Sequence, residues 1–152
     1  MSRRYGLRFH LVAEEFPVSN EAQLVEFLNS HSDDEVNALV TTIGVDEVLA
    51  QVLSSMRDRF QPDQAAGLDA VVRWDVRAGD ETHTFHMVVK DGGLTAAMGP
   101  PADSPRVMLG LDLADFLRLI VGQLDGMQAF MSGRLRLSGD MLFATNIDHW
   151  FG

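Results

Sequence analysis

The chain has 152 residues, of which 46% are hydrophobic, and its 22 acidic and 12 basic side chains give a formal net charge of −10. A chain of this length fits one globular domain whose core needs no disulfide or metal for stability. Because the sequence contains no cysteine, thiol nucleophiles, thiolate metal sites and disulfides are excluded. The acidic excess argues against nucleic acid and anionic membranes as main partners, since their negative charge would be repelled.

The N-terminal segment lacks the pattern of a targeting signal. Arg8 and His10 interrupt its only apolar stretch, and Glu14 follows soon after, so it has no continuous apolar segment of the kind a secretory signal requires. Residues 5–11 alternate apolar and polar side chains, which predicts an edge strand or an arm packed on the body. No apolar run elsewhere approaches the ~20 residues that span a bilayer. We therefore expect a soluble, cytoplasmic protein with no stable membrane insertion.

Three amphipathic helices are predicted before residue 60. In residues 20–29 the apolar side chains fall at helical spacing. Ser32, followed three residues later by Glu35, forms the sequence of a capping box and opens a second helix, which ends at Gly44. The third helix begins at Asp46 and carries a broad apolar stripe.

After residue 60 the spacing of the apolar residues changes from that of a helix to the alternation typical of a strand. Residues 68–77 alternate apolar and charged side chains, which predicts a half-buried antiparallel strand. A turn leads to a return strand over residues 82–90, and the Asp-Gly-Gly turn at residues 91–93 leads to a weaker third strand over residues 94–98. These segments predict a three-stranded meander.

The C-terminal part alternates short strands and helices. Residues 106–110 form an extended apolar run, and Asp112 is the expected N-cap of the helix that follows. A shorter helix is predicted over residues 125–131 and a strand over residues 134–138, and Asp140 is expected to cap a last helix that runs to the end. Helices after an antiparallel meander predict an α+β fold with helices on one face of the sheet.

The polar residues form no strong catalytic constellation. His83 and His86 are three residues apart on a predicted strand, which places them on opposite faces of the sheet. An acid–base pair of His86 with Asp75 across the hairpin stays open as an alternative. Residues 91–93 lack the spacing of a phosphate loop, and no serine stands in a nucleophile elbow. We expect no metal, no cofactor and no catalytic residue.

Four motifs follow one another between Phe60 and the C-terminus. They are Gln-Ala-Ala-Gly-Leu at residues 64–68, Val-Val-Lys-Asp-Gly-Gly at residues 88–93, Asp-Leu-Ala-Asp-Phe at residues 112–116, and the segment at residues 122–140 that contains Met-Ser-Gly-Arg and ends in Gly-Asp. In this combination the chain resembles the sterol carrier protein type 2 family of lipid-binding domains.

The resemblance implies a five-stranded, mostly antiparallel sheet that helices cover on one face, with an apolar tunnel between the two layers. Such a tunnel holds a fatty acid, an acyl-CoA, a sterol or a polyketide-like molecule, and no residue of the domain is catalytic. Methionine suits a cavity for ligands of varied shape because its side chain is flexible and polarizable. The residues expected to bind the ligand are Trp74, Phe85, Met87, Phe116, Leu117, Ile120, Met127, Phe130 and Met131.

The expected organisation has two parts. Residues 1–45 form an N-terminal arm and two short helices packed on the body, and residues 46–152 form the lipid-binding domain. The expected function is noncatalytic binding or carriage of a hydrophobic small molecule, in a chain whose arginine-rich, lysine-poor basic residues are typical of bacteria. One alternative is an accessory or dimerisation domain with a filled cavity, which meets a second copy or a partner enzyme through residues 1–45. The other is a biosynthetic enzyme that uses His83, His86 and Asp75.

Overall fold

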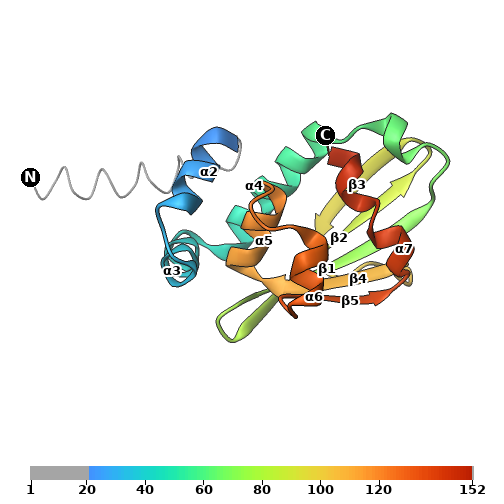
Figure 1. Cartoon of the computed structure of the whole chain (residues 1–152). Coiled ribbons are helices and arrows are strands. Elements are labelled where there is room, and N and C mark those ends of the chain that lie inside the picture. The colour runs from blue at the N-terminus through green and yellow to red at the C-terminus, as the bar shows by residue number, and fades with distance from the viewer. Residues whose placement is uncertain (1–20, 152) are drawn as a thin grey trace, which may run out of the picture.

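The computed structural model describes residues 21–151, and the arm predicted at residues 5–11 lies outside them. The helices are α2 (Glu21–Asn29), α3 (Asp33–Ile43), α4 (Val45–Arg59), η1 (Pro62–Ala65), α5 (Leu113–Ile120), α6 (Gly126–Met131), α7 (Met141–Ala144) and η2 (Ile147–Phe151). The strands are β1 (Ala70–Ala78), β2 (Glu81–Lys90), β3 (Gly93–Met98), β4 (Val107–Asp112) and β5 (Leu135–Gly139). Helices α2 and α3 lie at one end of the molecule and the sheet at the other, with α4 and α5 between them (Figure 1).

The five strands form one mixed sheet in the order β3-β2-β1-β4-β5. Strands β1, β2 and β3 form the predicted antiparallel meander, and β5 is antiparallel to β4. Strand β4 pairs with β1 in parallel, because the chain leaves β3 at one edge and returns to the start of β1 before β4 begins. The backbone N–H of Arg106 donates to the carbonyl of Val71 over 2.7 Å where the returning segment meets β1. The five-stranded, mostly antiparallel sheet is therefore confirmed.

Side-chain alternation decides which face of the sheet the helices cover. Val72, Trp74 and Val76 of β1 are buried, whereas the residues between them stay partly exposed. Phe116 and Leu117 of α5 are fully buried and belong to the same core. The apolar sides of the strands and of the helices meet between the two layers, as the predicted α+β fold requires.

Local signals set the boundaries of the first helices. The Ser32 hydroxyl accepts from the backbone N–H of Glu35 over 3.2 Å, and the Glu35 carboxylate accepts from the N–H of Ser32 over 2.8 Å. The hydrogen bond from the Ser32 backbone holds the pKa of Glu35 below its ordinary range. Gly44 separates α3 from α4 with a φ of 122°. Within residues 21–151 no single helix has the length and apolarity to cross a membrane, and α3 and α4 meet that test only as a pair bent by 99°.

The prediction of one continuous last helix is wrong in one respect, because the structure divides this segment into two short helices. Helix α7 ends at Ala144, and η2 begins at Ile147 after a short break. At the break the Thr145 hydroxyl donates to the carbonyl of Leu142 over 2.7 Å, a local bond that competes with helix continuation. Trp150 lies in η2, after the break, and its side chain is packed in the core, where it is 0% exposed.

Candidate ligand-binding site

Three aromatic rings form the centre of the predicted ligand-binding wall. The centroids of Trp74 on β1 and Phe85 on β2 lie 5.7 Å apart, because the two residues are partners across the strand pair. The ring of Phe116 on α5 lies 5.5 Å from Trp74 and 5.6 Å from Phe85. Met87 and Leu117 are fully buried in the same core. The structure therefore brings five of the nine predicted residues together in the core between the helices and the sheet.

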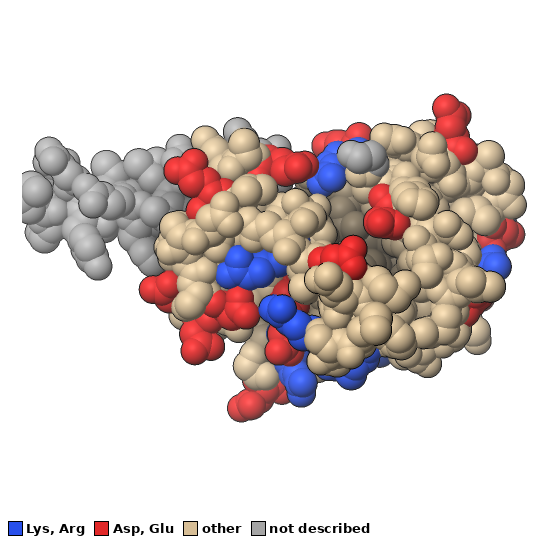
Figure 2. Space-filling view, viewed as in Figure 1, with Lys and Arg blue, Asp and Glu red and all other residues tan. Residues whose placement is uncertain are grey.

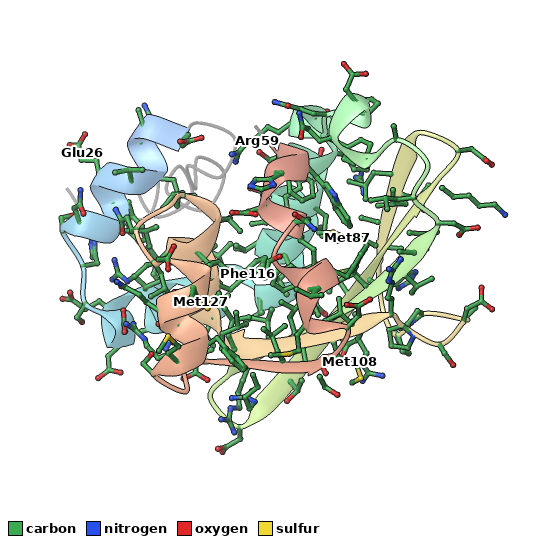
Figure 3. All side chains as sticks on the ribbon, turned by 45° about the vertical axis from the view of Figure 1, so that its right-hand side comes forward. Glu26, Arg59, Met87, Met108, Phe116 and Met127 are labelled. Atoms are coloured by element: carbon green, nitrogen blue, oxygen red, sulfur yellow. The ribbon has the colours of Figure 1, made fainter. Side chains whose placement is uncertain are left out.

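The other four predicted residues lie further out. Ile120 is half-buried at the end of α5, and Phe130 is half-buried against the core. Met127 and Met131 are 56% and 78% exposed, because the short helix α6 packs through Ala129 and turns both methionines to the solvent. Figure 3 shows Met87 and Phe116 in the interior and Met127 on the outer helix.

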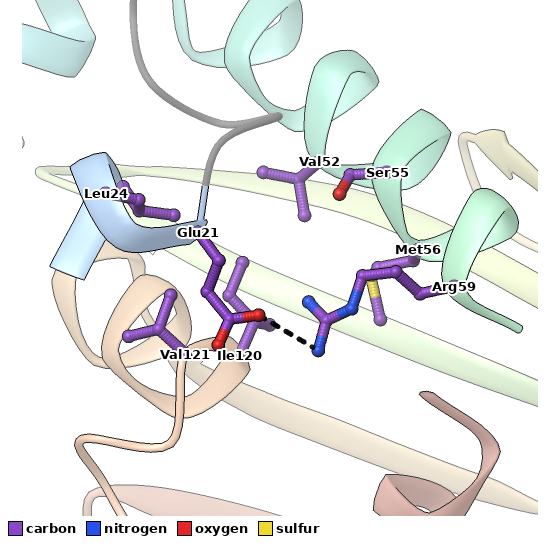
Figure 4. Close-up of a pocket in the computed structure, with 8 residues that line it drawn as sticks. All are labelled: Glu21, Leu24, Val52, Ser55, Met56, Arg59, Ile120 and Val121. Carbon is purple, nitrogen blue, oxygen red and sulfur yellow. Dashed lines mark ion pairs between the residues drawn. The ribbon is translucent and has the colours of Figure 1, made fainter. Parts of the chain in front are cut away.

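A hollow opens at the junction of α2, α4 and α5 (Figure 4). Its apolar lining consists of Leu24, Val52, Met56, Ile120 and Val121. The cavity volume is about 50 Å³, which holds a few water-sized groups, whereas sites for small-molecule ligands measure roughly 300–1,000 Å³. The space-filling view shows this face of the molecule hollowed, with acidic and basic side chains at the rim (Figure 2).

Most of the residues that line the hollow escaped the sequence-based prediction. Leu24, Val52 and Met56 belong to apolar helix stripes, which are the sequence signal that they face inward. A stripe does not distinguish a side chain packed on a neighbour from one beside a hollow, because that depends on where the helices meet. Of the nine predicted residues, only Ile120 is among those lining the hollow.

Within residues 21–151, the polar groups that line the hollow come from Ser55, Arg59 and Glu21. An Nη2–Oε1 distance of 3.6 Å joins Arg59, at the end of α4, to Glu21, at the start of α2. The guanidinium of Arg59 also donates to the backbone carbonyl of Phe151 over 3.2 Å. The site thus combines an aliphatic lining with one ion pair at its rim.

Each of the three groups of the enzymatic alternative has a hydrogen-bond partner of its own. Nδ1 of His83 lies 2.8 Å from a carboxylate oxygen of Asp46 on α4, whereas Nδ1 of His86 lies 2.8 Å from the carbonyl oxygen of Gly99. The two histidines therefore lie on opposite faces of β2, as predicted. Asp75 accepts from the Thr84 hydroxyl over 2.7 Å, and that oxygen also lies 3.2 Å from Nε of Arg73. The hydrogen bonds of Asp75, His83 and His86 therefore run to other groups and not to one another.

Two residues of the recognised motifs form an ion pair near α5. Asp115 is the buried charged residue of the described chain, and its carboxylate accepts from Nη2 of Arg134 over 2.6 Å. That hydrogen bond raises the pKa of Arg134 above its ordinary value. The pair joins the first turn of α5 to the start of β5, so its role is to fix the helix on the sheet.

Comparison with known proteins identifies the fold and the family. The SCP-2 sterol transfer family matches residues 49–151. The chain is 27% identical over 129 residues to the hydroxysteroid dehydrogenase-like protein 2 of zebrafish (Danio rerio). This alignment covers 82% of this chain and 30% of the relative. The chain therefore spans less than a third of the length of that relative.

Solved structures share the fold. The sterol carrier protein 2 like 2 of Aedes aegypti matches with a TM-score of 0.57 at 19% identity, covering 70% of this chain and 98% of the other. A sec-alkylsulfatase from Pseudomonas matches with a TM-score of 0.60 at 20% identity, covering 66% of this chain but 16% of the enzyme. Given the match over most of its length, the chain belongs to the SCP-2 sterol transfer family.

Proposed function

We propose that this chain binds a hydrophobic small molecule, without transforming it, between the helix layer and the sheet. The observation that carries the proposal is the hollow between α2, α4 and α5, to which all three helices contribute apolar side chains. The description of the family, sterol transfer, and the name of the Aedes aegypti relative, a sterol carrier protein, support an apolar ligand. Fatty acids, acyl-CoA, sterols and polyketide-like molecules all present the long apolar surface that such a lining favours.

Binding requires the hollow to grow into the layer beneath it. A volume of about 50 Å³ is too small for an acyl chain, so the helices that line the hollow must move apart to admit one. Each methylene group moved from water into the apolar layer stabilises the complex by about 0.8 kcal/mol. A long acyl chain therefore gains enough free energy to offset the packing that it displaces.

The buried indole of Trp74 also favours a ligand with a polar atom. Among residues 21–151 its N–H has no hydrogen-bond acceptor, although the side chain is only 4% exposed. A buried donor without a partner costs about 1–3 kcal/mol. A hydroxyl, carbonyl or ester oxygen on a ligand that reaches the Trp74–Phe85–Phe116 cluster would accept that hydrogen bond and relieve the cost.

We infer that residues 1–45 pack on the body and form one side of the site. Leu24 of α2 is 2% exposed and lines the hollow opposite α4. This segment precedes the residues that match the family model. The placement of α2 at the hollow supports a cover formed by residues that precede this match.

Substitution of one lining residue tests the proposed function. Ile120→Trp places a large ring in the hollow and should lower the affinity for an environment-sensitive fluorescent fatty acid about tenfold or more, the equivalent of about 1.4 kcal/mol. Met131→Trp is the matched control, because Met131 is 78% exposed on α6 and its replacement should leave the affinity unchanged. Fluorescence titration of both folded variants measures the difference.

Native mass spectrometry of the protein purified from its host provides a second, independent measurement. A retained mass that corresponds to a fatty acid, a sterol or a polyketide would support the proposal that the chain binds a hydrophobic small molecule. A ligand-free protein that also fails to bind the fluorescent probe would contradict the proposal and favour an accessory role in a larger assembly. That role would agree with the small share of its curated relative that this chain spans.

A further inference from the structure

The two edges of the sheet differ in how their backbone groups are covered. At the β3 edge, the guanidinium of Arg57 on α4 donates to the carbonyl of Ala96 over 2.9 Å, so a helix side chain satisfies part of that edge. At the β5 edge, no side chain of residues 21–151 bonds to the backbone of residues 135–139. An edge strand without such cover offers its free backbone groups to a strand of another chain.

Backbone alternation decides which groups of β5 face its open edge. The N–H of Asp140 donates to the carbonyl of Arg106 over 3.0 Å, in line with the pairing of β5 and β4. Since successive residues of a strand direct their backbone groups to opposite sides, the even-numbered residues of β5 bond toward β4. The backbone groups that face away from the sheet are those of Leu135, Leu137 and Gly139.

These outward groups are complementary to themselves. When a second copy lies antiparallel with its Leu137 opposite Leu137 of the first, the two leucines exchange both of their backbone hydrogen bonds. In the same register Leu135 of each copy lies opposite Gly139 of the other. A two-fold axis relates the copies, so the interface closes at a dimer and leaves neither β5 edge open.

The charges around β5 also favour antiparallel pairing. Arg134 and Arg136 stand at the start of the strand, and Asp140 follows its end. Arg134 is engaged with Asp115, whereas Arg136 is exposed and has no hydrogen bond or ion pair within the described residues. Its guanidinium lies over Gly110 of β4, so rotation of its own side chain is enough to bring it to a new partner. Antiparallel pairing places the Arg136 of each copy diagonally across from the Asp140 of the other.

Exposed apolar side chains lie on the helices at both ends of β5. Figure 1 shows β5 at the outer edge of the sheet, with α6 before it and α7 after it. Of the five large apolar side chains that are exposed in residues 21–151, four lie on these two short helices, and they are Met127, Met131, Met141 and Leu142. Exposed apolar side chains gathered in this way mark a surface that contacts another molecule. Antiparallel pairing brings α6 of each copy toward α7 of the other.

We propose that two copies of this chain pair through β5 and form a two-fold symmetric dimer with one continuous sheet. The open edge is thus occupied by a second copy, held by main-chain hydrogen bonds, by Arg136 with Asp140 of the other copy, and by the exposed apolar side chains of α6 and α7. None of these residues lines the hollow, so the dimer is independent of the proposed ligand.

Sedimentation velocity of the full chain over a range of concentrations tests the dimer. The natural chain should pass from monomer to dimer as its concentration rises. Arg136→Glu sets a carboxylate against Asp140 of the second copy and should raise the dissociation constant about tenfold, because the symmetry applies the change twice. Lys90→Glu is the matched control, because it makes the same change of charge at an exposed residue of β2 and should leave the dissociation constant unchanged.

Disulfide trapping tests the register, since the natural chain contains no cysteine. In the proposed pairing Arg136 lies opposite Ser138 of the second copy, with the two Cα atoms about 4.5 Å apart, a distance that a disulfide spans. An oxidised mixture of the Arg136→Cys and Ser138→Cys proteins should therefore form covalent dimers, and each protein alone should form few. The matched mixture of Thr95→Cys and Ala97→Cys, at exposed residues of the β3 edge, should also form few.

Three results would overturn the proposal. The first is a chain that stays monomeric at every concentration; slow hydrogen exchange at Leu135 and Leu137 in that monomer would assign the edge to another segment of the same chain, such as residues 5–11. The second is a dimer that responds equally to Arg136→Glu and Lys90→Glu and forms no disulfide between positions 136 and 138, since its copies meet elsewhere. The third is disulfide formation at the β3 edge to the same extent as at β5.

Discussion

At the scale of single residues, the backbone itself requires glycine at position 139. A Cβ atom there would lie 2.5 Å from the carbonyl oxygen of Arg106, and φ is 107°. Both partners of this contact belong to the backbone, so no side chain can move aside. We predict that Gly139→Ala destabilises the fold by roughly 3 kcal/mol, the upper end of what local backbone strain costs.

Gly79 supplies the matched control for this prediction. Its φ of 63° is also positive, but a Cβ atom there would meet nothing within 4 Å. Gly79→Ala should therefore cost only about 1 kcal/mol, the penalty of the left-handed conformation alone. Chemical denaturation of both variants measures the difference, and equal losses would show that the contact with Arg106 is unimportant.

Asp140 links stability to pH. Its carboxylate accepts from the backbone N–H of Phe143 over 2.9 Å and from Nε of Arg106 over 3.1 Å. These bonds, the one from Phe143 first, hold its pKa below the 3.8 of an ordinary aspartate. Because the pKa is lower in the folded than in the unfolded chain, the ionised group stabilises the fold above pH 3.8, and that stability is lost as the pH falls through the lowered value.

We predict that Asp140→Asn has a lower free energy of unfolding than the natural chain at neutral pH. The difference between the two free energies should narrow as the pH falls below about 4. Asparagine still caps the helix, so the difference isolates the charge. Asp103→Asn, in an exposed loop, should show no such narrowing. Denaturant titrations at several pH values provide the measurement, and a gap that stays constant with pH would contradict the assignment.

At the scale of elements, one side chain fastens α2 and α3 to α5. Arg118 donates to Asp33 of α3 over 2.9 Å, to the carbonyl of Leu28 over 2.9 Å and to the carbonyl of His31 over 3.0 Å. The Arg118 side chain is 17% exposed, so its two bonds to backbone carbonyls are partly shielded from water, whereas the Asp33 carboxylate is 50% exposed. A planar guanidinium satisfies acceptors in several directions, which an ammonium group cannot do with the same geometry.

We predict that Arg118→Ala costs roughly 3 kcal/mol and lowers the protection of amide hydrogens in α2 and α3 more than in the sheet. Arg118→Lys should restore little of the lost stability and little of the lost amide protection. Arg77→Ala, which breaks an exposed pair between β1 and Asp112, is the control and should cost less than about 1 kcal/mol. Hydrogen exchange read by mass spectrometry distinguishes local from global loss, and uniform loss of protection would refute a local role.

At the scale of the whole molecule, charge and size bear on how a ligand would reach the site. The net charge of −10 works against docking on anionic membranes, which favours uptake from solution or from a protein partner. Acidic and basic side chains both appear around the hollow in Figure 2. The zebrafish relative is much longer than this chain, which spans 30% of its length.

The sequence alone predicted most of the secondary structure. The Ser32–Glu35 capping box, the change from helical to alternating period and the Asp140 cap all act within a few residues, so each is visible without knowledge of the fold. The opposite placement of His83 and His86 followed from strand geometry in the same way. The motifs between residues 64 and 140 were enough to predict the family, which the comparison confirms.

Contacts between distant segments decided the rest. The sequence could not show that the last helix divides and buries Trp150, or that α6 turns Met127 and Met131 to the solvent. It also could not show that Glu21 meets Arg59 at a hollow between three helices. Local patterns determine which side of a helix or strand is apolar, but only the packing of all the elements decides whether that side meets a neighbour, a hollow or water.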